Sequence, residues 1–304
     1  MSVSSNRSAN ITPARLVWLV LTLLIPLATR SGEVHASEAQ VGPSIIGLDH
    51  IPVAVRDLDR ATQHYRALGF TLKPGRMHTD GIRNNHVKFK DGSGIELISP
   101  PAKPVDRLTS GYLSRITEGD GPAFLSFHAR DTNKLSVALR AASIDFRQRD
   151  GIALADPRLN FVFFDQDNRS PTDRPEHFAH PNTAVAMKGV WLALDESTRQ
   201  SLTKVLLALG AVRSSKMVFV PSATKADVWS VQNARIVLLP RSRQLVPGRP
   251  IVGVEFEVRD FAAAAEYLGW RALSLSDRSE MSDEKRVFVT PADAHGLWLV
   301  FHHD

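Results

Sequence analysis

Side chains that could do chemistry are concentrated in the first half of the sequence. His50 stands at the start of an apolar strand pattern, and Glu96 lies within a second one. Imidazole and carboxylate groups bind divalent cations and move protons. Arg83 and Asn84 supply guanidinium and amide donors of the kind that hold a carboxylate or a carbonyl at the rim of a cavity. These residues predict a binding site for a small oxygenated molecule.

A second group of polar residues follows further along the chain. His128 lies in the strand pattern of residues 124–131, and the loop of residues 165–182 carries His177, His180 and Asn182. His180 and Asn182 are candidate substrate-binding residues with the same donor chemistry. The alternative for both is turn chemistry, because Asn is favoured where the backbone reverses and Pro181 keeps the preceding residue extended.

The element that must position His50 is a strand followed by a helix. After the strand pattern of residues 47–55, Asp57 is a typical helix N-cap. Apolar residues then recur at helical spacing as far as Leu68, and Gly69 follows, where a helix commonly ends in a left-handed residue. A connection at residues 100–121 predicts a short helix, which includes Tyr112, over the cavity.

The strand and capped helix occur four times. The capping residues Asp57, Asp131, Asp195 and Asp260 are 74, 64 and 65 residues apart. Short strand patterns follow each helix, so one supersecondary module is used four times. Such a unit curls into an open half-barrel, and a second copy closes its unpaired sheet edge. The predicted fold is α+β, with four βαβββ modules forming two half-barrel domains at about residues 44–183 and 184–304.

These motifs resemble the glyoxalase-like domains of the vicinal oxygen chelate superfamily, which includes glyoxalases, bleomycin resistance proteins and extradiol dioxygenases. The resemblance rests on His50, the turn at residues 81–84, the hairpin at residues 91–97 and the His180-Pro181-Asn182 tripeptide. It is best over residues 45–195. From Val190 onward only the repeat pattern supports it.

The resemblance implies a metal-dependent lyase, isomerase or dioxygenase. One divalent ion (Fe, Mn, Ni or Zn) would be held by His50 and Glu96 and would polarise a substrate oxygen, while His128 or His177 moves a proton. A third ligand would have to come from His128, His177 or His180. The sequence departs from the metalloenzyme pattern because Phe124 stands seven residues before its helix cap, as His50 does before its own.

The alternative is a non-catalytic small-molecule-binding protein without a metal. In that case His50 is hydrogen-bonded near a strand start, and Glu96 is paired with Arg83 or Lys88. Either way the predicted partner is a small molecule. The net charge of +5 is spread along the chain without a basic run interleaved with aromatics, so nucleic acid is not expected.

Size and composition bound the remaining possibilities. At 304 residues the chain exceeds one ordinary domain, and the two domains pair within one chain or between the chains of a homodimer. The sequence has no cysteine, which excludes disulfides, thiolate catalysis and cysteine-bound metals. Ionisable residues on the strands of the first module give way to apolar ones after residue 184, so the second domain is expected to be structural.

The first residues predict a signal peptide. Arg7 and Arg15 precede the apolar run of residues 16–28, and small residues near Ala36 offer a cleavage site. The prediction is residues 1–36 as a signal peptide, with export to the periplasm or secretion and no stable membrane contact after cleavage. The alternative is an uncleaved N-terminal membrane anchor, which Pro26 and the short apolar run disfavour.

Overall fold

The computed structural model describes residues 44–149, 151–166, 168–269, 272–273 and 285–303. The predicted signal peptide, residues 1–36, lies outside the described residues. No helix in the described part of the chain is both long enough and apolar enough to span a membrane.

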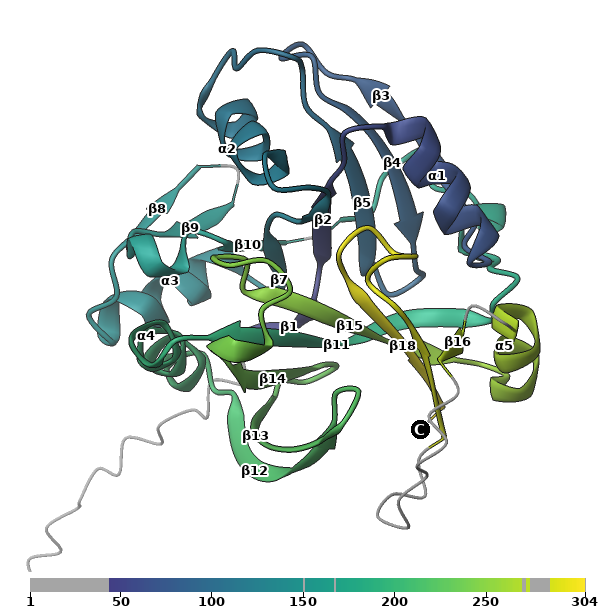
Figure 1. Ribbon diagram of the computed structural model, residues 1–304. Coiled ribbons are helices and arrows are strands. Elements are labelled where there is room, and N and C mark those ends of the chain that lie inside the picture. Colours follow the sequence, from purple (N-terminus) through teal and green to yellow (C-terminus); the bar gives the residue numbers. More distant parts are fainter. Residues whose placement is uncertain (1–43, 150, 167, 270–271, 274–284, 304) are drawn as a thin grey trace, which may run out of the picture. The chain divides into compact units, whose positions relative to one another are not determined.

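Four βαβββ modules follow one another along the chain (Figure 1). The first contains β2 (His50–Ala54), α1 (Leu58–Ala67), β3 (Lys73–Met77), β4 (Arg83–Lys88) and β5 (Gly94–Ser99). The second contains β7 (Leu125–Ala129), α3 (Thr132–Ala141), β8 (Phe146–Gln148), β9 (Ile152–Leu154) and β10 (Val162–Asp165). The third contains β11 (Ala184–Leu194), α4 (Glu196–Ala208), β12 (Val212–Phe219), β13 (Ala223–Ser230) and β14 (Arg235–Pro240). The fourth contains β15 (Ile251–Val258), α5 (Phe261–Leu268), β16 (Ala272–Leu273), β17 (Arg286–Val289) and β18 (Trp298–His302).

Several short elements lie outside the modules. They are β1 (Ile45–Leu48), α2 (Arg107–Ile116), β6 (Gly121–Pro122) and the 3-10 turns η1 (Pro157–Leu159), η2 (Pro175–Phe178) and η3 (Arg241–Arg243). The helix α2 confirms the prediction of a short helix between the first two modules. Its N-cap, Asp106, accepts the backbone N–H of Thr109 at 2.8 Å.

The predicted helix caps are confirmed in all four modules. In each, the aspartate side chain accepts a backbone N–H of the first helical turn; these caps are Asp57, Asp131, Asp195 and Asp260. The chain leaves α1 through Gly69 and α4 through Gly210, at φ values of 80° and 78°. In the second module Ser143 takes this left-handed conformation at φ 52°, because no glycine is present there.

The strands form three sheets. Residues 44–183 make two of them, in the orders β3-β4-β5-β2-β6 and β1-β7-β10-β9-β8, and residues 184–303 make an eight-stranded sheet, β12-β13-β14-β11-β15-β18-β17-β16. In every module the first strand runs parallel to the last. The sheets are open and curved, which confirms the predicted α+β fold of half-barrels (Figure 1). The described residues nevertheless form one compact unit.

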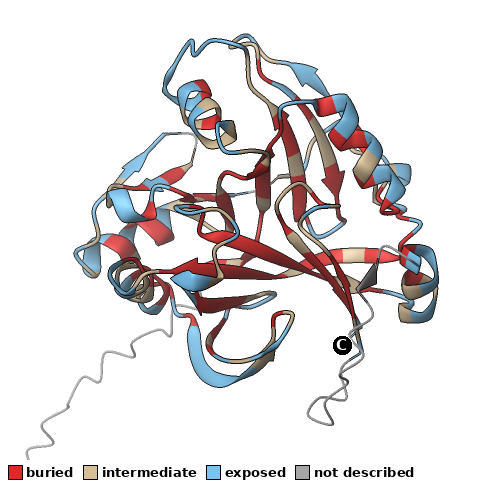
Figure 2. Cartoon of the chain, in the orientation of Figure 1, coloured by how far each residue is buried: buried red, intermediate tan, exposed pale blue. Residues whose placement is uncertain are grey.

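In residues 184–303, buried apolar side chains cover the sheet face that points away from the helices. Trp191, Phe288 and Val300 pack together there, and most of β15 and β18 is buried (Figure 2). Glu255 is a charged residue in this interior: it is 1% exposed, accepts the Trp191 Nε1–H at 2.8 Å and pairs with Arg235 and Arg286. His302, close to the C-terminus, is a buried residue of β18.

Candidate functional site

Two parallel strands bring His50 and Glu96 together. In the pairing of β2 with β5, His50 lies opposite Gly94 and Glu96 lies opposite Pro52, so alternation places both side chains on one face. The His50 Nε2 and Glu96 Oε2 atoms are 3.5 Å apart. Their side chains are 14% and 17% exposed, so both can be reached from solvent. This pair is the geometric centre of the candidate site.

A buried carboxylate holds the imidazole of His50. The Asp49 side chain is 1% exposed, and its Oδ2 lies 2.6 Å from His50 Nδ1 and accepts the Ser126 hydroxyl at 2.9 Å. Because a carboxylate accepts, Nδ1 carries a proton and Nε2 is the nitrogen that faces Glu96. Burial by itself lowers the pKa of His50, but the hydrogen bond to Asp49 and the charges of Asp49 and Glu96 outweigh burial and raise it.

An amide holds the carboxylate of Glu96. Asn84 on β4 donates from Nδ2 to Glu96 Oε1 at 2.5 Å, and its Oδ1 accepts the backbone N–H of Arg76 at 3.0 Å. Both ends of this amide are therefore used, and Glu96 presents its other oxygen to His50. Asp49, His50, Asn84, Glu96 and Ser126 are called the His50–Glu96 cluster below.

Aromatic side chains border the His50–Glu96 cluster. Phe163 on β10 packs edge-on to the His50 ring, with centroids 5.5 Å apart. Tyr112 on α2 is 4% exposed, and burial together with the negative charge of Glu96 raises its pKa. His86, opposite Glu96 in the pairing of β4 with β5, has a pKa lowered by burial. The cluster thus combines ionisable groups with an apolar border.

Arg83 does not join this cluster. It precedes Asn84 on β4, so its side chain lies on the other face of the sheet. There it is largely exposed and pairs with Asp59 of α1 at 3.4 Å. Lys88, the other expected partner of Glu96, is 3% exposed and pairs with Asp173 at 3.4 Å. Glu96 is therefore paired with neither of the two residues expected for it.

His180 and Asn182 are bonded to the backbone. His180 Nδ1 accepts the Thr71 N–H at 3.0 Å and Nε2 donates to the Lys88 carbonyl at 3.0 Å, while burial lowers the pKa of His180 to about 4. Asn182 is fully buried and donates from Nδ2 to the Leu68 carbonyl at 2.8 Å. These contacts favour the turn and packing alternative over substrate binding.

The two histidines predicted to move a proton lie on other elements. His128 is half-buried on β7, on the same side of the strand as Ser126 and level with Asp165 of β10. His177 is half-buried in η2, where its Nδ1 accepts the Arg174 N–H at 3.1 Å. Their roles stay predictions.

The residues present fit half of a metal-ligand set. His50 Nε2 and Glu96 Oε2 face one another at a separation suited to two ligands that each lie about 2.1 Å from one ion, and Asp49 supports the histidine from behind. In the second module Phe124 stands where His50 does. In its strand pairing, Phe163 stands where Glu96 does. The described part of the chain contains no group of three or more His, Asp or Glu side chains placed to hold one ion.

The comparisons with known proteins follow this geometry. Residues 48–209, more than half of the 304-residue chain, match the family model of the glyoxalase-like domain. The chain belongs to the glyoxalase-like domain family. The match includes the first two modules and continues through β11 and α4, across the predicted boundary between residues 183 and 184. No curated protein matches the sequence.

Solved structures share the fold of this glyoxalase-like protein at low identity. A fusion of a xylose isomerase-like TIM barrel and 4-hydroxyphenylpyruvate dioxygenase has a TM-score of 0.58 and 12% identity; the match covers 86% of the present chain and only 49% of the fusion. The 2,3-dioxygenase LapB from a Pseudomonas species has a TM-score of 0.57 and 13% identity, with coverage of 86% and 93%. Homoprotocatechuate 2,3-dioxygenase from Brevibacterium fuscum, in complex with 3,4-dihydroxyphenylacetate, has a TM-score of 0.58 and 11% identity, with coverage of 86% and 82%. At these identities the likeness shows a shared fold, and membership of the glyoxalase-like domain family rests on the family model.

Proposed function

We propose that this glyoxalase-like protein binds a small oxygenated molecule at the His50–Glu96 cluster. The observation that carries the proposal is the 3.5 Å approach of His50 Nε2 to Glu96 Oε2, each held from its far side by a second polar group. Side chains positioned in this way are ready to exchange hydrogen bonds with a ligand without first being ordered. The named ligand of one neighbour, 3,4-dihydroxyphenylacetate, supports an oxygenated ligand of this general size.

The chain's own residues can move a proton at this site. Asp49 keeps Nδ1 protonated and stabilises the charged imidazole, so a proton on Nε2 is shared with the Glu96 carboxylate. A ligand oxygen between these two atoms would receive a hydrogen bond from His50 and give one to Glu96. Phe163 borders the site and shields it partly from water. His128, on the same side of β7 as Ser126, is the second candidate for proton transfer.

A metal-dependent lyase, isomerase or dioxygenase is the second candidate function. It is favoured by the carboxylate of Asp49 behind His50, an arrangement that orients metal-binding histidines. His50 Nε2 and Glu96 Oε2 would hold the ion, which when bound supplies Lewis-acid polarisation of a substrate oxygen. The aromatic residues Phe124 and Phe163 provide no further ligand, which favours the metal-free function.

One experiment separates these candidates. The full chain is purified after growth with Mn, Fe, Ni and Zn present, its metal content is measured, and catechols, 2-hydroxy acids and 2-oxo acids are screened by ligand-observed NMR. The metal-free proposal expects a hit without stoichiometric metal. Binding should weaken about tenfold or more in His50→Gln and Glu96→Gln, each of which removes a charge-assisted hydrogen bond.

His303→Gln is the matched control, because His303 is exposed and, among the described residues, its ring bonds only the Val258 carbonyl, at 2.7 Å. Hits that survive both cluster substitutions would refute the site. Stoichiometric metal that is lost in His50→Gln and Glu96→Gln would support the metal-dependent candidate.

Export is a separate proposal, which rests on Arg7, Arg15 and the apolar run of residues 16–28. Expression of the full chain in a bacterium, followed by fractionation and mass determination, tests it. A periplasmic product that starts at Ser37 is expected. A full-length product in the membrane fraction would support the anchor, and a full-length soluble product would refute both.

A further inference from the structure

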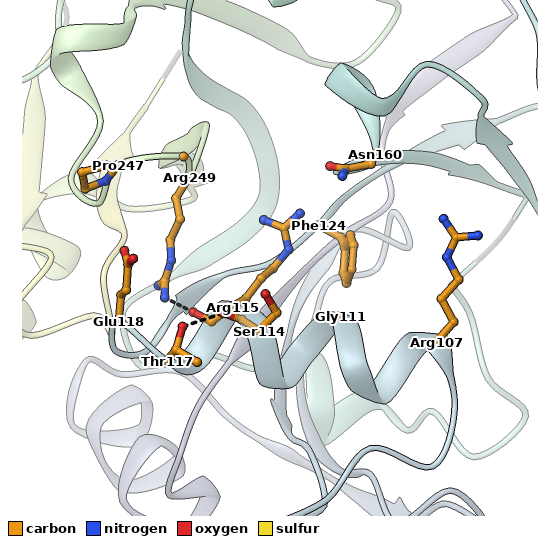
Figure 3. A pocket seen from close by; sticks show the side chains of 11 residues that line it. Arg107, Gly111, Ser114, Arg115, Thr117, Glu118, Phe124, Asn160, Pro247 and Arg249 are labelled. Atoms are coloured by element: carbon orange, nitrogen blue, oxygen red, sulfur yellow. Dashed lines mark hydrogen bonds between the residues drawn. The ribbon is translucent and has the colours of Figure 1, made fainter.

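A cavity of about 470 Å³ lies between α2 and the loop before β15, and no member of the His50–Glu96 cluster lines it (Figure 3). Its charged lining is mostly positive, with Arg107, Arg115 and Arg249 against the single carboxylate of Glu118. Polar groups of Ser114 and Asn160 complete the wall. A concave surface with this excess of cations attracts anions.

Arg249 is a fixed charge in this wall. It is 7% exposed, and its guanidinium donates to the carbonyls of Asp120 at 3.0 Å and Gly119 at 2.7 Å, and also to that of Arg115. Carbonyl oxygens satisfy its hydrogens but do not neutralise its charge. Arg249 therefore remains a positive charge that the fold holds in place at the end of α2 (Figure 3).

Arg115 points into the same cavity from α2 (Figure 3). Its guanidinium stacks 4.9 Å above the Phe124 ring. It is half-buried, and among the described residues it donates no side-chain hydrogen bond and makes no ion pair. Burial and the neighbouring charge of Arg249 lower the pKa of Arg115. Partly buried charges are normally paired, so this guanidinium lacks the counter-ion that its position calls for.

We propose that this cavity is a binding site for a small organic anion that carries a carboxylate or phosphate group. Its oxygens would pair with the planar donor fork of Arg115, beside the fixed charge of Arg249. Arginine binds both groups in a bidentate manner. The Phe124 ring keeps the guanidinium flat against the wall, so little side-chain freedom is lost on binding. Arg107, which is exposed, draws anions toward the opening.

A neighbouring cavity of about 230 Å³ extends this site. It shares Arg115, Asn160 and Gly248 with the first cavity and adds Arg241, the carboxylate of Asp195, and Arg158, which is paired with Asp156 at 2.8 Å. The anionic group would occupy the first cavity and the rest of the molecule could reach into the second. The site is distinct from that of the proposed function, because no member of the His50–Glu96 cluster lines either cavity; the Phe124 ring, which packs on Tyr112 at 5.2 Å, lies between the two sites.

Titration of the full chain with inorganic phosphate and, separately, with benzoate tests the proposal. Binding is followed by calorimetry and by the NMR signals of the arginine Nε–H groups at constant low salt. At least one probe is expected to bind saturably and to shift the Arg115 signal. Its dissociation constant should rise about tenfold or more in Arg115→Gln, because a charge-assisted bidentate contact is lost. Arg115→Lys keeps the charge but lacks the planar donor fork, so its dissociation constant should lie between those of the parent chain and of Arg115→Gln.

Arg140→Gln is the matched control. Arg140 also stacks on an aromatic ring, 5.2 Å above Phe146, but it lies on α3 and lines neither of these two cavities. Its substitution should leave anion affinity within about twofold of the parent chain. Absence of saturable binding of both probes, or binding that Arg115→Gln does not weaken in a folded variant, would overturn the proposal. Ligands of the His50–Glu96 cluster should bind Arg115→Gln normally, so the two proposals can fail separately.

Discussion

Asp49→Asn is the sharpest test of the electrostatics at the candidate site. The substitution keeps the shape of a side chain that is 1% exposed but removes its charge. A hydrogen bond to a charged partner contributes about 1.5 to 3 kcal/mol and a neutral one about 0.5 to 1.5 kcal/mol. With the His50 Nδ1 contact at 2.6 Å, the variant should lose about 1 to 1.5 kcal/mol of unfolding free energy when His50 is protonated. The pKa of His50 should fall as well.

The sign of the pH dependence follows from linkage. The pKa of His50 is raised in the folded protein above its ordinary value of 6.5. Its contribution to stability is therefore fully present below pH 6.5 and is lost as the pH rises through the folded pKa. The stability difference between the parent chain and Asp49→Asn should be largest at acid pH and should shrink in alkali.

Two measurements check this prediction. Urea unfolding at several pH values gives the stability difference, and two-dimensional NMR of the histidine ring nitrogens gives the His50 titration directly. Ser126→Ala is the matched control, because it removes only the neutral 2.9 Å bond to the same carboxylate and leaves the charge in place. A pKa of His50 that is unchanged or higher in Asp49→Asn would refute the assignment of Asp49 as the stabilising charge.

Three further substitutions test the packing around the sites. Glu255→Gln should destabilise the chain by about 3 kcal/mol in urea unfolding, because two arginines lose their buried counter-charge. The control Glu257→Gln should cost less than about 1 kcal/mol, because Glu257 is in a half-exposed pair with a lysine 3.3 Å away. His180 has a pKa of about 4, so the folded state binds a proton on His180 less readily than the unfolded state does. The free energy of unfolding should therefore fall by up to about 3 kcal/mol as the pH is lowered from 6.5 to 4. His180→Gln should reduce this pH dependence in urea unfolding. Gly69→Ala should cost more than Gly248→Ala in thermal unfolding: both glycines have φ near 80°, but a Cβ at position 69 would lie 2.7 Å from Tyr267, and one at position 248 meets nothing within 4 Å. Equal losses of thermal stability in the two variants would show that the left-handed backbone conformation alone, and not the contact with Tyr267, determines the cost.

The fold was predictable from sequence because its signals are local. Each helix cap lies next to the helix it starts, and the spacing of the four caps reveals the repeat without any knowledge of tertiary contacts. The pairing of His50 with Glu96 was implied by the resemblance to glyoxalase-like domains, and both residues lie in strands of one module. These relations are encoded within short stretches of chain or within one repeat.

The supporting residues of the site could not be found in the same way. The Asp49 carboxylate is also bonded by Ser126, which is 77 residues away, and alternation along a strand does not reveal which face is solvated. For this reason the sequence does not show that Lys88 is buried, at 3% exposed, or that His86 lies opposite Glu96. The same ambiguity about the two faces of a strand allowed the wrong expectation that Arg83 lies in the site.

The first two modules carry different kinds of side chain at corresponding positions. The positions that hold His50 and Glu96 in one module hold Phe124 and Phe163 in the other, and each phenylalanine now borders a polar group: Phe163 packs on His50 at 5.5 Å and Phe124 carries Arg115 at 4.9 Å. The second module thus has two aromatic walls at the positions where the first has two donors. If these two phenylalanines are what prevents a complete metal site, a donor introduced in place of one of them should allow a metal ion to bind.

Phe163→Glu is the variant that tests this argument. A carboxylate in place of the ring beside His50 would add a third donor to His50 Nε2 and Glu96 Oε2, which already lie 3.5 Å apart. Zn²⁺ or Mn²⁺ affinity, measured by calorimetry, should rise about tenfold or more over the parent chain, since each added anionic ligand strengthens the site. His50→Gln in the Phe163→Glu background should abolish the gain, which separates a true centre from adventitious binding. If affinity stays unchanged in a folded Phe163→Glu chain, the position of Phe163 does not correspond to that of Glu96, and the difference between the two modules has another cause.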